Sequence, residues 1–175
     1  MKELGFSLNQ FEEFINELTS NKIHYLVIAG LALDGKRGHL SRFHEDLDLL
    51  CLLSDQDAVA IIYENLGYSI KDKKNNLYQI SKKDSGSIHI CYLVSEGNEF
   101  VAYGNFVTRF PKNLFYLSQR GKIDEIEFNI GPNELLKIWG IQSKNQEDRE
   151  FAQSLKVESN IMDRVSRIPY STRLR

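Results

Sequence analysis

Cysteine and proline are scarce in this sequence. Its 175 residues include 2 cysteines and 3 prolines, and no repeat or low-complexity tract interrupts them. Cys51 and Cys91 both lie in apolar, strand-like stretches, so we expect them to pack in the core rather than to form a disulfide. Two cysteines and 4 scattered histidines lack the spacing of a structural zinc site. These features favour one continuous α+β domain with a hydrophobic core.

The sequence also lacks a strong net charge and a long hydrophobic run. Its 22 basic and 24 acidic residues give a formal net charge of -2, so no overall field attracts nucleic acid or an anionic membrane. An anionic ligand must therefore be held by local groups. No stretch has the length and composition of a secretory signal or a membrane span, so we expect a cytoplasmic protein with no membrane partner.

Hydrophobic periodicity predicts a helix and then a strand at the start of the chain. Apolar residues spaced for one helix face, with Ser7 and Gln10 as a capping box, predict a helix over residues 7–20. A short apolar run over residues 24–28 is expected to form a strand. Ala29-Gly30 is expected to end it, because glycine between a strand and a helix marks a turn.

The same order of strand, turn and helix is expected to follow. A helical turn is predicted over residues 31–33, with a loop over 35–38 after it. The strongly apolar run over residues 46–53 predicts another strand. Ser54 together with Asp57 is expected to cap the next helix.

The second half of the sequence predicts further strands and then helices. Pro111 is expected at the first position of a short helix, and the chain is expected to be mostly helical after Asn133. The turn-forming Asp84-Ser85-Gly86 lies between the first two strand-like runs, which predicts a hairpin. The strand-like runs cover residues 76–82, 87–94, 99–108 and 123–130.

This order of elements predicts an α+β fold, in which helices flank a mixed β-sheet and a helical segment closes the C-terminus. We assign residues 1–155 to this domain and residues 156–175 to a C-terminal helical, basic tail. The last residues, 164–175, are expected to be poorly ordered unless they dock.

Two aspartates carry the clearest chemical signal. Asp46 and Asp48 belong to one strand, in which alternate side chains share a face, so their carboxylates point one way while Leu47 and Leu49 point into the core. Paired carboxylates beside an apolar strand repel each other and lose hydration unless a cation binds them. Mg²⁺ prefers such oxygen ligands together with substrate phosphates, which predicts phosphoryl or nucleotidyl transfer. The alternative is that this strand end is only a solvated edge.

A resemblance supports the first interpretation. Two stretches resemble the signature of the lincosamide and aminoglycoside adenylyltransferases, which belong to the polymerase-beta-like nucleotidyltransferase superfamily. These stretches are Val27-Ile28-Ala29-Gly30-Leu31-Ala32-Leu33-Asp34 and Arg42-Phe43-His44-Glu45-Asp46-Leu47-Asp48. The resemblance extends over about residues 25–155 and implies the nucleotidyltransferase fold.

The resemblance also implies roles for individual residues. Asp46 and Asp48 would bind Mg²⁺, and Gly30 and Lys144 would contact the triphosphate. Arg42 could neutralise a phosphate, although it could equally belong to an ordinary basic loop. His44 is interpreted as a structural residue that orders the entry to the strand.

Two departures from the family pattern bear on activity. Ala29 replaces the first glycine of the family's pair, and its methyl group would hinder the close approach of a phosphate. His89 stands where the family carries a third acid. It could act as the general base, ligate a softer metal, or mark a lost activity. Glu96 and Glu99 are reserve candidates for the third acid.

These features predict a Mg²⁺-dependent enzyme that transfers a nucleoside monophosphate from a nucleoside triphosphate to a hydroxyl of a small molecule. One alternative is a degenerate domain that binds nucleotide or a partner chain without chemistry. Another is a toxin-like transferase acting on RNA or protein, although the slightly acidic composition argues mildly against RNA. A chain of this length has limited room for an acceptor pocket, which a homodimer would enlarge.

Overall fold

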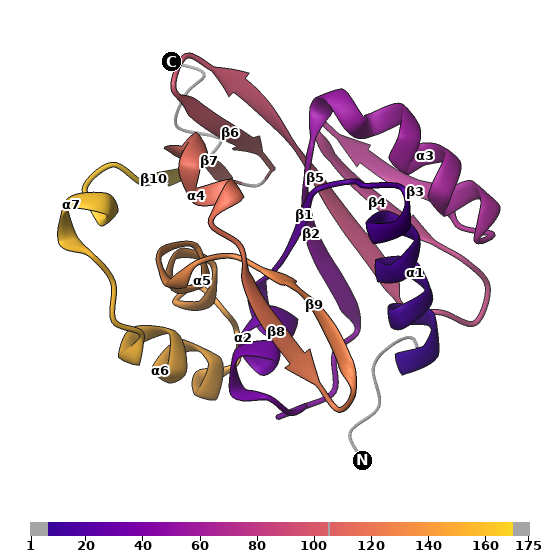
Figure 1. Cartoon of the computed structure of the whole chain (residues 1–175), viewed down its shortest axis with the longest axis horizontal. Coiled ribbons are helices and arrows are strands. Elements are labelled where there is room, and N and C mark those ends of the chain that lie inside the picture. The colour runs from indigo at the N-terminus through magenta and orange to yellow at the C-terminus, as the bar shows by residue number, and fades with distance from the viewer. Residues whose placement is uncertain (1–6, 105, 170–175) are drawn as a thin grey trace.

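The computed structural model of the chain describes residues 7–104 and 106–169. A single sheet runs through the described part, with helices packed on both of its faces (Figure 1). The strands are β1 (Tyr25–Ile28), β2 (Asp46–Leu52), β3 (Ser69–Lys74), β4 (Leu77–Ser81), β5 (Ser87–Glu96), β6 (Glu99–Tyr103), β7 (Phe106–Pro111), β8 (Gln119–Ile123), β9 (Ile126–Ile130) and β10 (Ser166–Pro169). The helices are α1 (Leu8–Ser20), α2 (Ala29–Arg37), the 3-10 turn η1 (Leu53–Asp55), α3 (Gln56–Asn65), α4 (Lys112–Tyr116), α5 (Asn133–Gly140), α6 (Gln146–Ser154) and α7 (Ser159–Met162).

The sheet is mixed, with mostly antiparallel neighbours. Its main order is β10-β7-β6-β5-β2-β1-β9-β8, and the β3–β4 hairpin joins through β4 to β5. Only the β2–β5 and β1–β9 neighbours are parallel within the described strands. The long β5 changes partner along its length, since residues 88–91 pair with β4 and residues 93–96 pair with β6. The predicted α+β fold with a mixed, helix-flanked sheet is therefore confirmed.

One face of the sheet is covered by α1 and α3, which lie side by side in Figure 1. The capping box at the start of α1 is confirmed, because the Ser7 hydroxyl accepts from the Gln10 amide and the Gln10 side chain accepts from the Ser7 amide. The apolar stripe of α1 is fully buried against this face. The opposite face packs against α4 and α5 around a second core cluster that includes Phe110 and Leu135.

Two predicted strands are each divided by a turn. Residues 99–108 are not one strand, because the chain reverses between β6 and β7. The prediction of one strand over 123–130 is also wrong. Asp124 has a left-handed φ of 52°, so the chain turns there and forms the β8–β9 hairpin. The Gly104-Asn105 pair in the first of these stretches is a hairpin signal that the sequence interpretation missed, whereas Asp124-Glu125 in the second contains neither glycine nor proline.

Helix boundaries also differ from the prediction. Helix α2 begins at Ala29 and includes residues 35–37, which were expected to be loop; it ends at Gly38, whose φ of 86° terminates the helix. Helix α3 follows η1 and has no side-chain cap, so the predicted capping by Ser54 and Asp57 is wrong. Pro111 is the last residue of β7 and precedes α4 rather than starting it.

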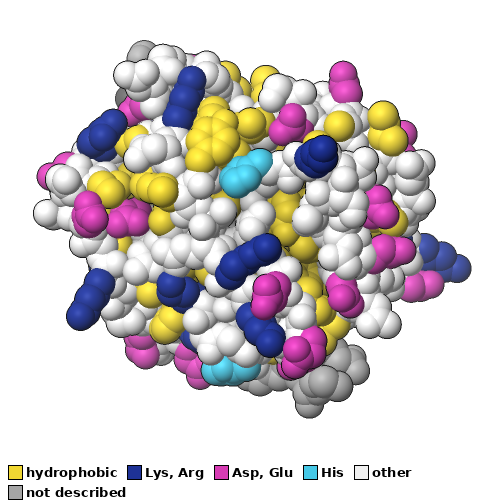
Figure 2. Space-filling view, viewed as in Figure 1, with side chains coloured by type: hydrophobic (Ala, Val, Ile, Leu, Met, Phe, Trp, Pro, Cys, Tyr) yellow, Lys and Arg dark blue, Asp and Glu magenta, His cyan; other side chains and the backbone are white. Residues whose placement is uncertain are grey.

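The C-terminal part holds the expected helices and one unexpected strand. After Asn133 the chain forms α5, α6 and α7, as predicted, but β10 then returns to the sheet and pairs with β7. Residues 170–175 of the predicted tail lie outside the described part, and the division of the chain at residue 155 stays a prediction. Charged side chains of both signs are interspersed over the face shown in Figure 2, in keeping with the small net charge. None of the described helices is long and apolar enough to cross a membrane.

Candidate metal and nucleotide site

Strand β2 places two carboxylates on one face, as its sequence predicts. Leu47 and Leu49 are buried in the core beneath α1 and α3, whereas the alternating Asp46 and Asp48 side chains are 46% and 31% exposed. The even-numbered aspartates are thereby fixed toward the other face, at the beginning of the strand. Further along the strand, Leu50 is buried on that other face, in the second core cluster.

His89 joins the two carboxylates from the neighbouring strand. Strands β2 and β5 are parallel, and their register sets Asp48 directly beside His89. The His89 Nδ1 atom lies 3.2 Å from Asp48 Oδ1 and 3.7 Å from Asp46 Oδ2. One donor atom from each of Asp46, Asp48 and His89 can be chosen so that all three lie within 4.8 Å of one another. The structure therefore brings together the three residues that the sequence singled out.

The electrostatics of this cluster show mutual repulsion partly relieved by the imidazole. Burial raises the pKa of Asp46, and the nearby Asp48 carboxylate raises it further. The hydrogen bond with Asp48 raises the pKa of His89, although burial opposes that rise. Without another cation, the imidazolium form of His89 is the group that offsets the paired carboxylates.

The same three residues fit a divalent metal ion. Carboxylate and imidazole ligands lie about 2.0–2.2 Å from such an ion, so donor atoms around one ion are up to about 4 Å apart. The cluster needs only a small contraction to reach that spacing. An ion would also remove the repulsion that raises the pKa of Asp46.

Helix α2 begins beside the aspartates. Strand β1 runs antiparallel to β2 and pairs Ile28 with Asp48, so the first residues of α2 lie at the carboxylate cluster. Ala29 has a φ of 58°, a left-handed conformation that glycine adopts without strain and alanine adopts at a cost of about 1–2 kcal/mol. The backbone therefore has the conformation of a glycine turn although its first residue is alanine.

Gly30 is required by packing. A Cβ atom at this position would collide with the Arg42 guanidinium and would lie 2.9 Å from His44 Cε1. The absence of a side chain lets both of these residues lie directly over the start of α2. The predicted contact of Gly30 with the triphosphate stays a prediction.

Asp34 is a buried anchor that the sequence interpretation did not identify. It is completely buried, and its carboxylate accepts hydrogen bonds from Arg37, His44 and both the amide and hydroxyl of Ser41. Burial raises the pKa of Asp34, but the hydrogen bonds from His44 and Ser41 outweigh it and lower the pKa to about 2. This anchor fixes the segment between α2 and β2, and it confirms a structural role for His44.

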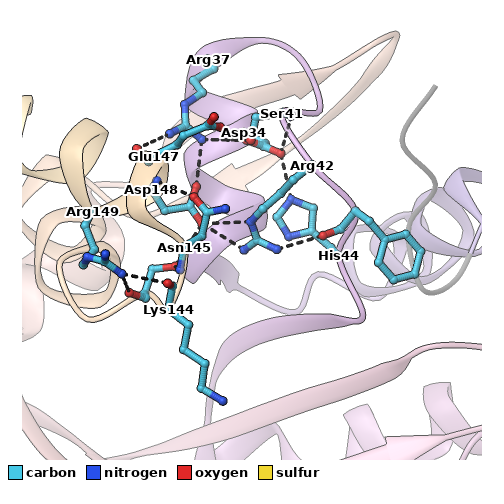
Figure 3. Close-up of polar contacts among 12 residues, drawn as sticks. Asp34, Arg37, Ser41, Arg42, His44, Lys144, Asn145, Glu147, Asp148 and Arg149 are labelled. Carbon is cyan, nitrogen blue, oxygen red and sulfur yellow. Dashed lines mark hydrogen bonds and ion pairs between the residues drawn. The ribbon is translucent and has the colours of Figure 1, made fainter.

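Asp148 is the second buried anchor of the same network (Figure 3). It is completely buried, although it lies in a charged stretch of the sequence. Its carboxylate accepts from Arg37, from Nε and Nη2 of Arg42, and from the Ser143 hydroxyl. The network therefore ties α6 to the segment that leads into β2. The residues of this network are far apart in the sequence. The only sequence feature that could have indicated the network is a lone acid next to an apolar stretch, which is Asp34.

Arg42 and Lys144 both line a cleft with a volume of about 1090 Å³ above the cluster. The Arg42 guanidinium already donates to Asp148 and to the Phe43 carbonyl, so a phosphate would have to use its remaining N–H groups. The Lys144 side chain extends away from the buried network (Figure 3). The cleft is also lined by Ala29, Gly30, Asp46, Asp48 and His89.

The reserve acids are not part of this cleft. Glu96 and Glu99 lie within ion-pair distance of Arg109, at 2.7 Å and 3.7 Å respectively. They occupy the end of β5 and the start of β6, away from His89 near the start of β5. The hypothesis that one of them supplies the third acid is therefore wrong.

The cysteines are core residues, as predicted. Cys51 and Cys91 are both buried and unpaired with each other. Burial raises the pKa of the Cys91 thiol to about 12, so the thiol is uncharged at neutral pH, although Cys91 is one of the residues that line the cleft.

Comparison with known proteins identifies the fold. No family model and no curated protein sequence matches the chain, but solved structures do. The lincomycin-bound crystal structure of the lincosamide antibiotic adenylyltransferase LnuA superposes with a TM-score of 0.66 at 15% identity, covering 86% of this chain and 99% of that chain. The chain has the nucleotidyltransferase fold.

Structures of a second enzyme agree. The solution structure of the antibiotic-resistance factor ANT(2'')-Ia gives a TM-score of 0.61 at 13% identity, covering 82% of this chain and 80% of that chain. The crystal structure of ANT(2'')-Ia with adenylyl-2''-tobramycin gives 0.59 at 14% identity, covering 82% of this chain and 86% of that chain. The nucleotidyltransferase fold therefore spans most of the chain, as the sequence resemblance implied.

Proposed function

We propose that this nucleotidyltransferase-fold chain transfers a nucleoside monophosphate from a nucleoside triphosphate to a hydroxyl of a small molecule. The observation that carries the proposal is the convergence of Asp46, Asp48 and His89 beside the start of α2, at the wall of the cleft. The likeness to adenylyltransferases that act on antibiotics supports the reaction class.

Asp46 and Asp48 would hold the divalent metal, for which Mg²⁺ is the first expectation because two carboxylates and triphosphate oxygens are its preferred ligands. When bound, the metal supplies positive charge that stabilises the triphosphate and the leaving pyrophosphate. The backbone at Ala29 and Gly30, at the start of α2, and the Lys144 ammonium would contact the phosphates, because all three residues line the cleft.

His89 would act as the general base. Its Nδ1 atom faces the carboxylates, which leaves Nε2 to accept a proton. The acceptor oxygen would attack the α-phosphorus, its proton would pass to Nε2, and the bond to the bridging oxygen of the β-phosphate would break. In this arrangement Asp48 orients the imidazole as well as binding metal.

The cleft is large enough for two ligands. Small-molecule sites commonly measure about 300–1,000 Å³, so a volume of about 1090 Å³ accommodates a triphosphate beside a compact acceptor. The homodimer that the short sequence suggested is therefore not needed to enlarge the pocket, and it stays a prediction that light scattering can test.

A degenerate nucleotide-binding domain is the second candidate. It is favoured by Ala29, which places a methyl group where a phosphate would approach the turn, and by the replacement of the third acid with His89. This protein would bind metal and triphosphate but release no pyrophosphate.

The test is a transfer assay on the full chain with ATP or GTP, Mg²⁺ or Mn²⁺, and a panel of hydroxyl-bearing small molecules. We expect acceptor-dependent pyrophosphate release and a nucleotidylated product detected by mass spectrometry. Both signals should disappear in Asp46→Asn with Asp48→Asn. Glu127→Gln, at an exposed position of β9, is the matched control and should retain them. Triphosphate binding without release would favour the degenerate domain, and the absence of binding would refute both candidates.

A further inference from the structure

An arginine from the unexpected strand lines the cleft. Strand β10 pairs with β7, and Arg167 lies opposite Thr108 in that ladder. Together with α5 and β6 these strands build one wall of the cleft. The residues of this wall are Ala102, Gly104, Phe106, Thr108, Trp139 and Arg167.

Two aromatic rings hold the Arg167 guanidinium. Its central carbon lies 4.5 Å from the Phe106 ring centroid and 5.3 Å from the Trp139 ring centroid. Its Nη1 atom donates to the Ile138 carbonyl at 3.3 Å. These contacts fix the position of the group and favour its charged form.

Among the described residues, the Arg167 guanidinium has no ion-pair partner, and its Nε atom is buried without a hydrogen bond. Burial lowers the pKa of Arg167 to about 10, while Asp48 and Cys91 act against that change. A partly buried cation without an anion is costly, and Asp48 would be occupied by metal in the loaded protein.

We propose that Arg167, clamped between Phe106 and Trp139, binds an oxyanion of a ligand in the cleft. The inference rests on the proposed function for the identity of that ligand. A guanidinium presents a planar fork of N–H donors that matches carboxylate and phosphate oxygens. The oxyanion belongs either to the nucleoside triphosphate or to a carboxylate or phosphate group on the acceptor. This wall contains no acidic side chain, so the ligand group that lies against it is not expected to be cationic.

Trp139 provides the measurement, because it is the only tryptophan of the chain and lies against Arg167. Inorganic phosphate is titrated into the full-length, metal-free protein at constant ionic strength, and Trp139 fluorescence is recorded. We expect a saturable change in the wild type, an at least roughly tenfold weaker response in Arg167→Gln, and partial retention in Arg167→Lys. Arg120→Gln, on the exposed side of β8, should behave as the wild type.

A second titration separates the two sources of the oxyanion. The protein is first saturated with a non-hydrolysable triphosphate analogue and Mg²⁺, and phosphate is then added. Loss of the phosphate response assigns Arg167 to the triphosphate, and its persistence assigns Arg167 to the acceptor.

A wild type without a saturable response, or an Arg167→Gln variant with the same response, overturns the proposal. If the analogue does not bind but the first titration depends on Arg167, the proposed function fails while the oxyanion site stands. Circular dichroism verifies that each variant is folded, and Phe106→Leu, which removes one ring of the clamp, substitutes for Arg167→Gln if that variant is not.

Discussion

Replacing Asp34 by asparagine tests whether the buried network holds the site together. Asp34 is completely buried and accepts hydrogen bonds from Arg37, Ser41 and His44. Its pKa falls from 3.8 to about 2 on folding, which corresponds to roughly 2.5 kcal/mol at about 1.4 kcal/mol for each tenfold change in proton affinity. Asparagine keeps the size of the side chain but leaves the Arg37 charge with only Asp148. We therefore expect Asp34→Asn to lose about 2–3 kcal/mol of unfolding free energy at neutral pH.

The loss should depend on pH in a defined direction. Because the folded-state pKa of Asp34 is lowered, its stabilisation is fully present above the unfolded value of 3.8 and disappears as pH falls through about 2. The difference between wild type and variant should shrink to roughly half by about pH 3.

Urea unfolding followed by circular dichroism at pH 7 and pH 3 measures both effects. Asp124→Asn is the matched control, since Asp124 is exposed and asparagine tolerates its left-handed φ; it should change stability by less than about 0.5 kcal/mol. An Asp34→Asn variant as stable as this control at pH 7, or equally destabilised at both pH values, would refute the reasoning.

Three further predictions concern the site itself. Ala29→Gly should strengthen binding of a triphosphate analogue in calorimetry, and unchanged binding would mean that the Ala29 methyl does not obstruct a phosphate. The free energy of unfolding should change by less than about 1 kcal/mol, because relief of the left-handed strain and the added freedom of the unfolded chain oppose each other. In metal-free protein, His89→Ala should lose more unfolding free energy at pH 6 than at pH 9. The pKa of His89 is raised in the folded state, so the stabilisation that His89 contributes is present below about pH 6.5 and is lost as pH rises through the folded-state pKa. An equal loss at both pH values in urea unfolding would contradict this. His89→Gln should leave the ratio of Mn²⁺ to Mg²⁺ affinity unchanged in calorimetry, because the general base donates its Nδ1 proton to Asp48 and does not ligate the metal. A ratio that falls in His89→Gln would show that the imidazole is a metal ligand rather than the base, since imidazole binds transition metals better than Mg²⁺.

The sequence predicted the features that depend on local pattern. The capping box of α1, the alternation of Asp46 and Asp48 with buried leucines, and the β4–β5 hairpin all follow from spacing along a few residues. The resemblance then placed His89 near the aspartates, and the parallel register of β2 and β5 confirms that position. Strand β3 was missed because its residues are all exposed, so no alternation marks it.

The features that the sequence did not predict depend on contacts between distant residues. Asp148 lies among other charged residues in the sequence, and Asp34 is marked only by its apolar neighbours. The contact of both carboxylates with Arg37 forms only in the folded chain. Gly30 is explained by the collision that a side chain would make with Arg42 and His44. Arg167 lies in a segment that was expected to be a basic tail, and its place in the cleft depends on the pairing of β10 with β7.

The central claim is that Asp46 and Asp48, beside His89, form a divalent-metal site for a nucleoside triphosphate. Its most direct test is isothermal titration of the full chain with a non-hydrolysable triphosphate analogue, with Mg²⁺, with Mn²⁺ and with chelator. We predict binding that requires a divalent metal and is weakened at least tenfold in Asp46→Asn with Asp48→Asn, but unchanged in Glu127→Gln. Binding that persists with chelator, or that the double variant retains at wild-type affinity, would contradict the claim.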